Sequence, residues 1–153
     1  MTAKFKNLIG LVSSFFPVQI WRAQKGAGSF LTLDMGGVIE KKRKNGTLKE
    51  VGELHLWVYL SDWVLSRDGI EILNSSEEDE KVYEVVLNSL NGSSLVSTKE
   101  NSNNRSVEFK LNNGCSLSVM ANTDIYDAGD DLFVFYINDK ETISYSLDKG
   151  WYI

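Results

Sequence analysis

Residues 51–63, VGELHLWVYLSDW, decide which fold the rest of the chain can adopt. Between Val51 and Leu60, apolar residues recur at every second position, which is the period of a β-strand. The alternate positions include His55 and Trp57, so the other face of this strand is bulky as well. Because a strand that is apolar on both faces is normally covered on both, we predict that this segment is a central strand of a sheet.

Period-two patterns before and after this segment predict further strands. They cover residues 18–20, 30–33, 38–44, 93–98, 106–111, 115–121, 132–138 and 141–147. Three dipeptides predict hairpin turns, namely Asn45-Gly46, Asn113-Gly114 and Asn138-Asp139. Residues 34–37, DMGG, predict a turn that closes the second strand. The polar residues 97–104 predict a loop at the edge of the sheet.

The N-terminal segment has the spacing of an amphipathic helix. Its apolar face is formed by residues at positions i, i+3, i+4 and i+7, namely Phe5, Leu8, Ile9 and Val12. Pro17 ends this run because its ring cannot continue a helix from within. Lys4 and Lys6 before a short apolar stretch leave a signal peptide as the alternative interpretation.

A second helix is predicted after Ser75-Ser76. Ser76 with Asp79 three residues later resembles a capping box. The predicted buried face consists of Val82, Val85, Val86 and Leu90. Asn91-Gly92 is expected to end the helix, since these residues readily adopt a left-handed conformation.

Together these patterns predict an α+β fold. We expect a curved, mainly antiparallel sheet, largely a meander, with one or two helices packed against it. The 153 residues are enough for one hydrophobic core, and we expect residues 1–153 to form a single domain.

Composition narrows the classes of function. The formal net charge is −5 and the isoelectric point is about 4.9, whereas non-specific nucleic-acid binding requires an excess of Lys and Arg. The lone Cys115 can form no internal disulfide, and no Cys/His cluster has zinc spacing. We therefore expect no cofactor, no metal, no nucleic-acid partner and no membrane association, in a cytoplasmic protein.

The sequence offers little catalytic chemistry. His55 is the only histidine, and its place inside a predicted strand favours a structural role over that of a general base. The basic run 41–44, KKRK, lies beside the Asn45-Gly46 turn and is interpreted as a solvated hairpin end rather than a nucleic-acid or membrane contact. We predict that the protein is not an enzyme.

Two acidic groups are the predicted partner-binding residues. The first is Glu77, Glu78, Asp79 and Glu80, where four acidic residues exceed what a helix start needs to complement its dipole. The second lies between two predicted strands and consists of Asp124, Tyr126, Asp127, Asp130 and Asp131. The second group lacks the alternating spacing of a calcium loop. An acidic surface suits a basic protein partner because opposite charges raise the rate of association.

The chain also resembles a class of small bacterial proteins. The resemblance extends over roughly residues 28–151 and rests on the segments 52–63, 74–76, 90–92, 107–119, 132–135 and Trp151. Similar patterns occur among immunity proteins of polymorphic-toxin systems, including those of contact-dependent inhibition. The resemblance implies an intracellular, non-enzymatic and often acidic protein that binds and neutralises one cognate toxin. It assigns no functional residue, because those families share no fixed binding motif.

Our leading hypothesis is therefore an immunity protein that occludes a toxin domain with its acidic residues. A basic toxin would suit that charge. The alternatives are a small ligand- or protein-binding domain with another role and, less favoured, a hydrolase that depends on carboxylates.

Overall fold

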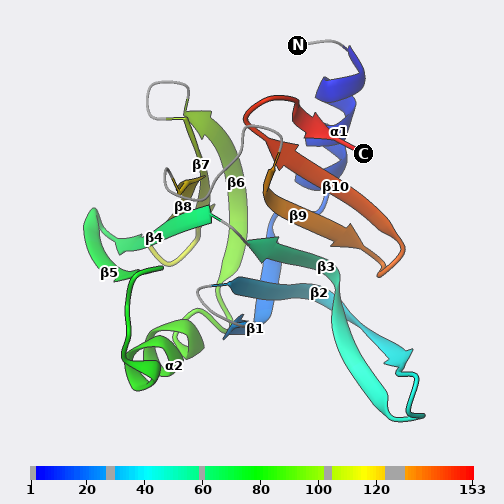
Figure 1. Cartoon of the computed structure of the whole chain (residues 1–153), viewed down its shortest axis with the longest axis horizontal. Helices are drawn as coiled ribbons and strands as arrows, with labels where there is room; N and C mark the ends of the chain where they lie inside the picture. Colours follow the sequence, from blue (N-terminus) through cyan, green and yellow to red (C-terminus); the bar gives the residue numbers. More distant parts are fainter. Residues whose placement is uncertain (1–2, 27–29, 59–60, 102–104, 123–129) are drawn as a thin grey trace.

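A computed structural model describes residues 3–26, 30–58, 61–101, 105–122 and 130–153 (Figure 1). The two helices are α1 (Ala3–Ser13) and α2 (Glu80–Asn88). The strands are β1 (Val18–Lys25), β2 (Leu31–Lys42), β3 (Leu48–Val58), β4 (Ser61–Arg67), β5 (Ile70–Asn74), β6 (Ser94–Asn101), β7 (Ser106–Leu111), β8 (Cys115–Ala121), β9 (Asp131–Ile137), β10 (Glu141–Ser146) and β11 (Gly150–Tyr152).

All these strands belong to one open antiparallel sheet, in the order β11-β10-β9-β3-β2-β1-β6-β7-β8-β4-β5. The predicted antiparallel sheet with packed helices is thus confirmed. Seven of the ten neighbouring pairs are consecutive in sequence, as in a meander, and the exceptions are β9–β3, β1–β6 and β8–β4. As predicted, β3 is an interior strand.

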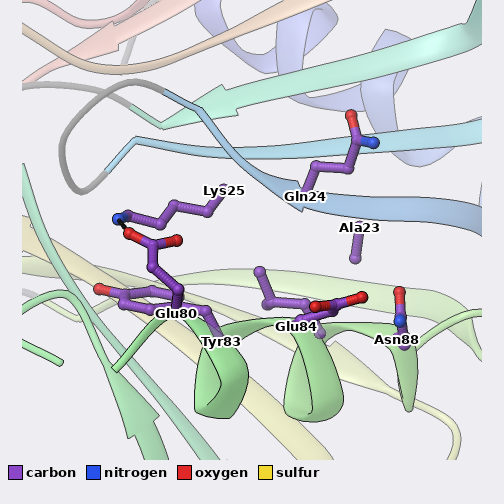
Figure 2. A pocket seen from close by; sticks show the side chains of 8 residues that line it. Ala23, Gln24, Lys25, Glu80, Tyr83, Glu84 and Asn88 are labelled. Carbon is purple, nitrogen blue, oxygen red and sulfur yellow. Dashed lines mark hydrogen bonds and ion pairs between the residues drawn. The ribbon is translucent and has the colours of Figure 1, made fainter. Parts of the chain in front are cut away.

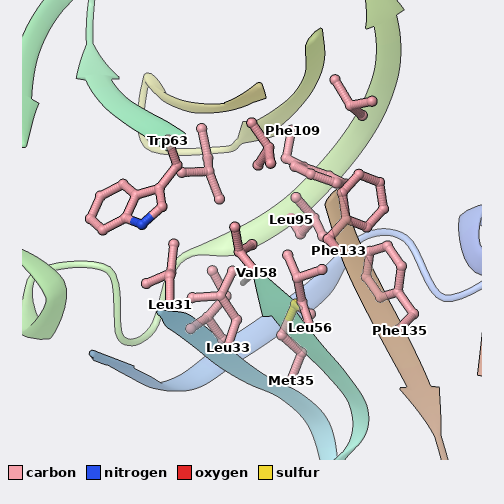
Figure 3. Close-up of a cluster of buried hydrophobic side chains, with 14 of the residues drawn as sticks. Leu31, Leu33, Met35, Leu56, Val58, Trp63, Leu95, Phe109, Phe133 and Phe135 are labelled. Atoms are coloured by element: carbon pink, nitrogen blue, oxygen red, sulfur yellow. The ribbon is translucent and has the colours of Figure 1, made fainter. Parts of the chain in front are cut away.

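The sheet consists of two halves joined by a narrow connection. β1 pairs with β6 only through Val18↔Leu95 and Gln19↔Ser94. Beyond this connection the halves turn toward each other, so that Phe109 of β7 packs edge-on against Phe133 of β9 with ring centroids 5.2 Å apart. Figure 3 shows side chains from both halves pointing into this shared interior.

The interior between the halves is the hydrophobic core. Trp63, Phe109, Phe133, Phe135 and Trp151 are among its largest fully buried side chains. Burial of one such side chain contributes roughly 1.5–3 kcal/mol, so this core is a main source of stability. Leu8 and Val12 of the predicted N-terminal helix are buried against it, as their spacing indicates. Neither helix in the described part of the chain is long and apolar enough to cross a membrane.

The predicted turn at residues 34–37 is wrong. β2 continues through it as one strand, and the register with β3 shifts between Met35 and Val38. Gly36 and Gly37 together oppose Glu53, which is the arrangement of a β-bulge. Gly36 adopts a φ of 75°, which glycine tolerates without strain. Both glycines lie in the bulge. Beyond it the two strands continue as a projecting hairpin of residues 38–51, which we call the arm (Figure 1).

The start and end of α2 also differ from the prediction. Asp79 caps the helix by accepting a hydrogen bond from the Lys81 amide at 2.9 Å. The Ser75 hydroxyl instead accepts a hydrogen bond from the Trp63 amide on β4. The helix ends at Asn88, and the Gly92 amide donates to the Ile20 carbonyl of β1. The predicted Asn-Gly helix end is therefore a contact with the sheet.

The predicted buried face of α2 is confirmed in part, because Leu90 is buried and Val82 and Val86 are partly buried against the core. Tyr83 and Leu87 are buried, whereas Val85 is 70% exposed. The Tyr83 ring packs edge-on against Trp63, with centroids 5.9 Å apart. This aromatic contact determines which side of the helix faces the sheet.

Of the remaining local predictions, β7 and β8 have the predicted bounds. Asn138 and Asp139 both adopt left-handed φ angles, 53° and 56°, as a tight hairpin turn requires. Residues 97–101 belong to β6, so the predicted edge loop is wrong there. The strands β4, β5 and β11 were not predicted, although Asp68-Gly69 between the first two is a hairpin signal of the same kind.

The close approach of β2 and β3 beside the bulge yields a stability prediction. A Cβ atom added to Gly52 would lie 2.4 Å from the backbone nitrogen of Met35. Because neither backbone can yield cheaply, Gly52→Ala is expected to lower the free energy of unfolding by about 1–3 kcal/mol or more. Urea denaturation would measure the change.

Gly10→Ala is the matched control, because a Cβ at this exposed position of α1 would meet nothing within 4 Å. It is expected to raise stability by roughly 0.5–1 kcal/mol. A Gly52→Ala variant as stable as the parent protein would contradict the close approach of the two strands.

Candidate functional site

The first candidate surface is a groove of about 440 Å³ between α2 and β1 (Figure 2). β1 contributes Ala23, Gln24 and Lys25, and α2 contributes Glu80, Tyr83, Glu84, Leu87 and Asn88. Figure 2 shows Lys25 and Glu80 meeting across one end of the groove. The groove exists because α2 packs on the sheet through Tyr83 and Leu87.

One end of this groove is held by a small polar network. The Lys25 ammonium is 2.6 Å from a carboxylate oxygen of Glu80 and 4.8 Å from the centroid of the Tyr83 ring. The Tyr83 hydroxyl donates to the carbonyls of Asn74 and Ser75. Burial raises the pKa of Tyr83, and the nearby negative charges of Glu77 and Glu80 raise it further. Tyr83 therefore remains a neutral hydrogen-bond donor that ties α2 to the end of β5.

The first predicted acidic group lies at the start of α2. Asp79 is its N-cap, and Glu77 accepts a hydrogen bond from the Asp79 amide at 3.1 Å. Glu80 is paired with Lys25, although its side chain is 75% exposed. Glu78 is exposed, as is Glu84 one turn further along α2, and neither forms an ion pair within the described ranges. Local structure thus uses three of the four residues of this group and leaves Glu78, together with the neighbouring Glu84, unpaired at the surface.

Only part of the second predicted acidic group belongs to the residues that the structure describes. Asp124, Tyr126 and Asp127 lie outside the described residues. Asp131 begins β9 and accepts a hydrogen bond from the Tyr152 hydroxyl, and Asp130 beside it is half-buried. β9 lies between β3 and β10, whereas α2 packs on β1 and β5. The described members of the two groups therefore belong to different parts of the sheet.

A second candidate surface lies on the face of β1, β2, β3 and β9 that is turned away from the core. The strand register places Arg22, Asp34, His55 and Tyr136 side by side across these four strands. Asp34 is the unusual member, because it is a charged residue and yet is only 1% exposed. Burying a charge is costly unless the charge has partners.

The Asp34 carboxylate has three donors. One oxygen lies 2.9 Å from the Gly52 amide and 2.7 Å from His55 Nδ1, and the other lies 2.8 Å from Arg22 Nε. Burial acts to raise the pKa of Asp34, but these hydrogen bonds, with that from His55 the strongest, outweigh it and hold the pKa below its usual value. Asp34 therefore remains an ionised anchor among its donors.

Beside this anchor is a hollow of about 190 Å³. It lies at the junction of the arm with the sheet and is lined by Lys49, Val51, Gly52, His55, Trp57, Tyr136 and Asp139. The His55 and Tyr136 rings have centroids 5.9 Å apart. The hollow and the α2–β1 groove share no lining residue.

Sequence reasoning missed this second surface because it assigned Asp34 to a turn. An available signal was the alternation Leu31, Leu33, Met35, which places Asp34 on the opposite face of a continuing strand. The pairing of Asp34 with His55, residues 21 positions apart, depends on the bulge and could not be read from either segment alone. Among the residues that the structure describes, no group of three or more His, Cys, Asp or Glu side chains is placed to hold a metal ion.

Comparison with known proteins adds no relative: no protein-family model, no curated protein and no solved structure matches this chain.

The Asp34 cluster makes a stability prediction. Asp34→Asn would place an amide N–H₂ where three donors now converge, leaving at least one donor without an acceptor. The expected loss is about 1–3 kcal/mol of unfolding free energy, measured by urea denaturation at neutral pH. Asp148→Asn, at an exposed turn residue, is the control and should change stability by less than about 0.5 kcal/mol.

The lowered pKa of Asp34 also predicts how this difference depends on pH. A carboxyl group whose pKa is lower in the folded state stabilises the fold fully above its unfolded pKa, about 3.9 for Asp. That contribution is lost as the pH falls through the folded pKa. The stability gap between the parent protein and Asp34→Asn should therefore be full at pH 6 and shrink below about pH 4. A gap that widens on acidification would contradict the proposed charge state.

Proposed function

We propose that this protein is a non-enzymatic protein-binding domain whose α2–β1 groove receives a basic segment of a partner. The observation that carries the proposal is the charge around this groove. Five carboxylates, Glu77, Glu78, Asp79, Glu80 and Glu84, face only two lysines, Lys25 and Lys81, in the same region.

The geometry of the groove favours an extended segment as the occupant. The groove runs along α2 from Glu80 to Asn88, a length of nine residues of helix. Ala23 and Leu87 supply an apolar floor, and Glu84 and Glu80 stand at the edge. An apolar centre with a charged rim is the usual organisation of a protein-binding surface.

The electrostatics favour a basic partner. Glu78 and Glu84 are exposed and unpaired within the described ranges, so an approaching cation meets their charge without first breaking an ion pair. Such complementary charges mainly raise the rate of association, and salt screens the effect over about 10 Å at 0.1 M ionic strength. Binding of the partner should therefore be faster at low salt.

The biological role we propose is that of an immunity protein. The protein would cover the active surface of one cognate bacterial toxin and thereby neutralise it. This role rests on the resemblance in sequence patterns and on the acidic groove, which suits a basic toxin domain. A protein-binding domain with another role is the alternative, and the identity of the captured partner distinguishes the two.

The direct test uses a lysine-rich peptide of ten residues as the probe and ¹⁵N NMR of the whole chain as the readout. Amide signals of Ala23, Leu87 and their neighbours are expected to shift on titration, because these residues line the groove. The double substitution Glu78→Lys, Glu84→Lys should weaken binding at least about tenfold at low salt, since it converts attraction into repulsion.

The matched control is Glu141→Lys, which makes the same kind of change at an exposed residue of β10. It should leave peptide binding within about twofold of the parent protein, because charges beyond a Debye length are largely screened. Shifts that map to the other half of the sheet, or a Glu78→Lys, Glu84→Lys variant that binds like the parent protein, would overturn the groove as the binding site. The same variants then test any toxin recovered as a partner in a growth-rescue assay.

A further inference from the structure

The hollow beside Asp34 contains three polar groups that the protein itself does not use. Lys49 Nζ, His55 Nε2 and the Tyr136 hydroxyl have no hydrogen-bond or ion-pair partner within the part of the chain that the structure describes. His55 and Tyr136 are half-buried, and polar groups that are withdrawn from water usually have a hydrogen-bond partner. Polar side chains that line one small hollow without protein partners are a sign of a ligand site.

The orientation of His55 follows from its contact with Asp34. An ionised carboxylate can only accept hydrogen bonds, so the Nδ1 atom, 2.7 Å from the Asp34 oxygen, carries the hydrogen. Nε2 lies on the other edge of the ring and is left for a ligand. In the imidazolium form both ring nitrogens carry a hydrogen, so Nε2 is then a donor as well. His55 can thus donate to an oxyanion.

The charges around the hollow favour an anion as well. Lys49 brings an unpaired ammonium group to its rim. The carboxylate of Asp139, which also lines the hollow, is 3.0 Å from the Lys41 ammonium, and that ion pair offsets its charge. Lys41 and Lys49 lie directly opposite each other on the arm. Lys41, Lys49 and Asp139 together carry a net charge of +1, which attracts an anion.

The remaining walls are aromatic and apolar. Trp57 and the Tyr136 ring flank His55 on the same face of the sheet, and Val51 forms part of the floor. Aromatic faces of this kind stack with planar rings, including nucleobases. The volume of about 190 Å³ is below the roughly 300–1,000 Å³ of a site that encloses a drug-sized ligand. The hollow therefore fits one end of a ligand and leaves the rest on the surface.

We propose that this hollow binds the phosphate-bearing end of a nucleotide. Lys49, Tyr136 and His55 would donate to the phosphate oxygens, and Trp57 would stack with the base. The site is independent of the proposed protein-binding groove, because the two share no residue. Two sources provide this chemistry, a free mononucleotide and the phosphorylated end of a single-stranded RNA.

The test titrates AMP, UMP, adenosine and inorganic phosphate into the protein, with NMR of the imidazole as the readout. Because His55 is the only histidine, the imidazole signals need no assignment. AMP and UMP are expected to shift these signals with a Kd of about 1 mM or tighter. Adenosine, which lacks the phosphate, and inorganic phosphate, which lacks the ring, should each bind at least tenfold more weakly than AMP.

Two substitutions test the assigned groups. Lys49→Met removes the charge, and Tyr136→Phe removes only the hydroxyl and keeps the ring. Each is expected to weaken AMP binding about fivefold or more, as loss of a hydrogen bond to a charged group does. Lys44→Met, at the exposed tip of the arm, is the matched control and should leave AMP binding unchanged. Thermal unfolding of all three variants checks that the fold is intact.

Several outcomes would overturn the proposal. These are imidazole signals that do not move with either nucleotide, inorganic phosphate that binds as tightly as AMP, or full AMP binding by Lys49→Met and Tyr136→Phe. A 5′-phosphorylated RNA octamer identifies the source if the site is confirmed. Binding tenfold tighter than AMP, weakened by Lys44→Met, assigns the site to RNA, and equal binding assigns it to the free nucleotide. Failure of the lysine-rich peptide to bind would leave this result unaffected, since that probe tests the other surface.

Discussion

The buried carboxylate of Asp34 is the constraint on which the rest of the structure depends. It is almost fully buried on the face of β2 that is turned away from the core, and it is tolerated there only because the Gly52 amide, His55 and Arg22 all donate to it. These donors come from β3 and β1, so one side chain fixes the register of three adjacent strands. The bulge at Gly36 and Gly37 begins two residues after Asp34, and beyond it the two strands form the arm.

Both candidate surfaces are consequences of how the two half-sheets are joined. β1 connects the halves, supplies Arg22 to the Asp34 cluster, and supplies Ala23 and Lys25 to the α2–β1 groove. The groove presents an excess of negative charge, and the hollow presents positive and aromatic groups, although the chain as a whole has a net charge of −5. The net charge of the chain alone would have predicted the acidic groove but not the hollow. A domain with two chemically opposite surfaces on one sheet can engage a partner and a second ligand independently, which is the view of function that we propose.

Much of the sheet could be predicted from the sequence, because period-two alternation and the Asn-Gly or Asn-Asp turns are local signals, as β7, β8 and the turn at Asn138 show.

The errors in the sequence-based prediction have a common cause. The helix boundaries and the turn assigned to residues 34–37 both depend on contacts between distant segments: Trp63 with Ser75 and Tyr83, Gly92 with Ile20, and Asp34 with His55. Of the predicted site residues, Glu77, Glu78, Asp79 and Glu80 lie beside the α2–β1 groove. The groove could not be predicted from local patterns, because it forms only where α2 meets β1. The role of these residues and of Asp130 and Asp131 in partner binding stays a prediction.

The most direct measurement of the central constraint is the tautomer of His55, read from a long-range ¹H–¹⁵N NMR spectrum at a pH where the imidazole is neutral. The single histidine makes the spectrum unambiguous. If the Asp34 carboxylate holds Nδ1, the ring carries its hydrogen on Nδ1 and leaves Nε2 as the bare nitrogen, the opposite of the form that free histidine prefers. Asp34→Asn should then abolish this preference. A neutral ring with its hydrogen on Nε2 in the parent protein would show that Asp34 and His55 are not joined as described, and it would remove the basis for both the anchored register and the ligand-facing orientation of His55.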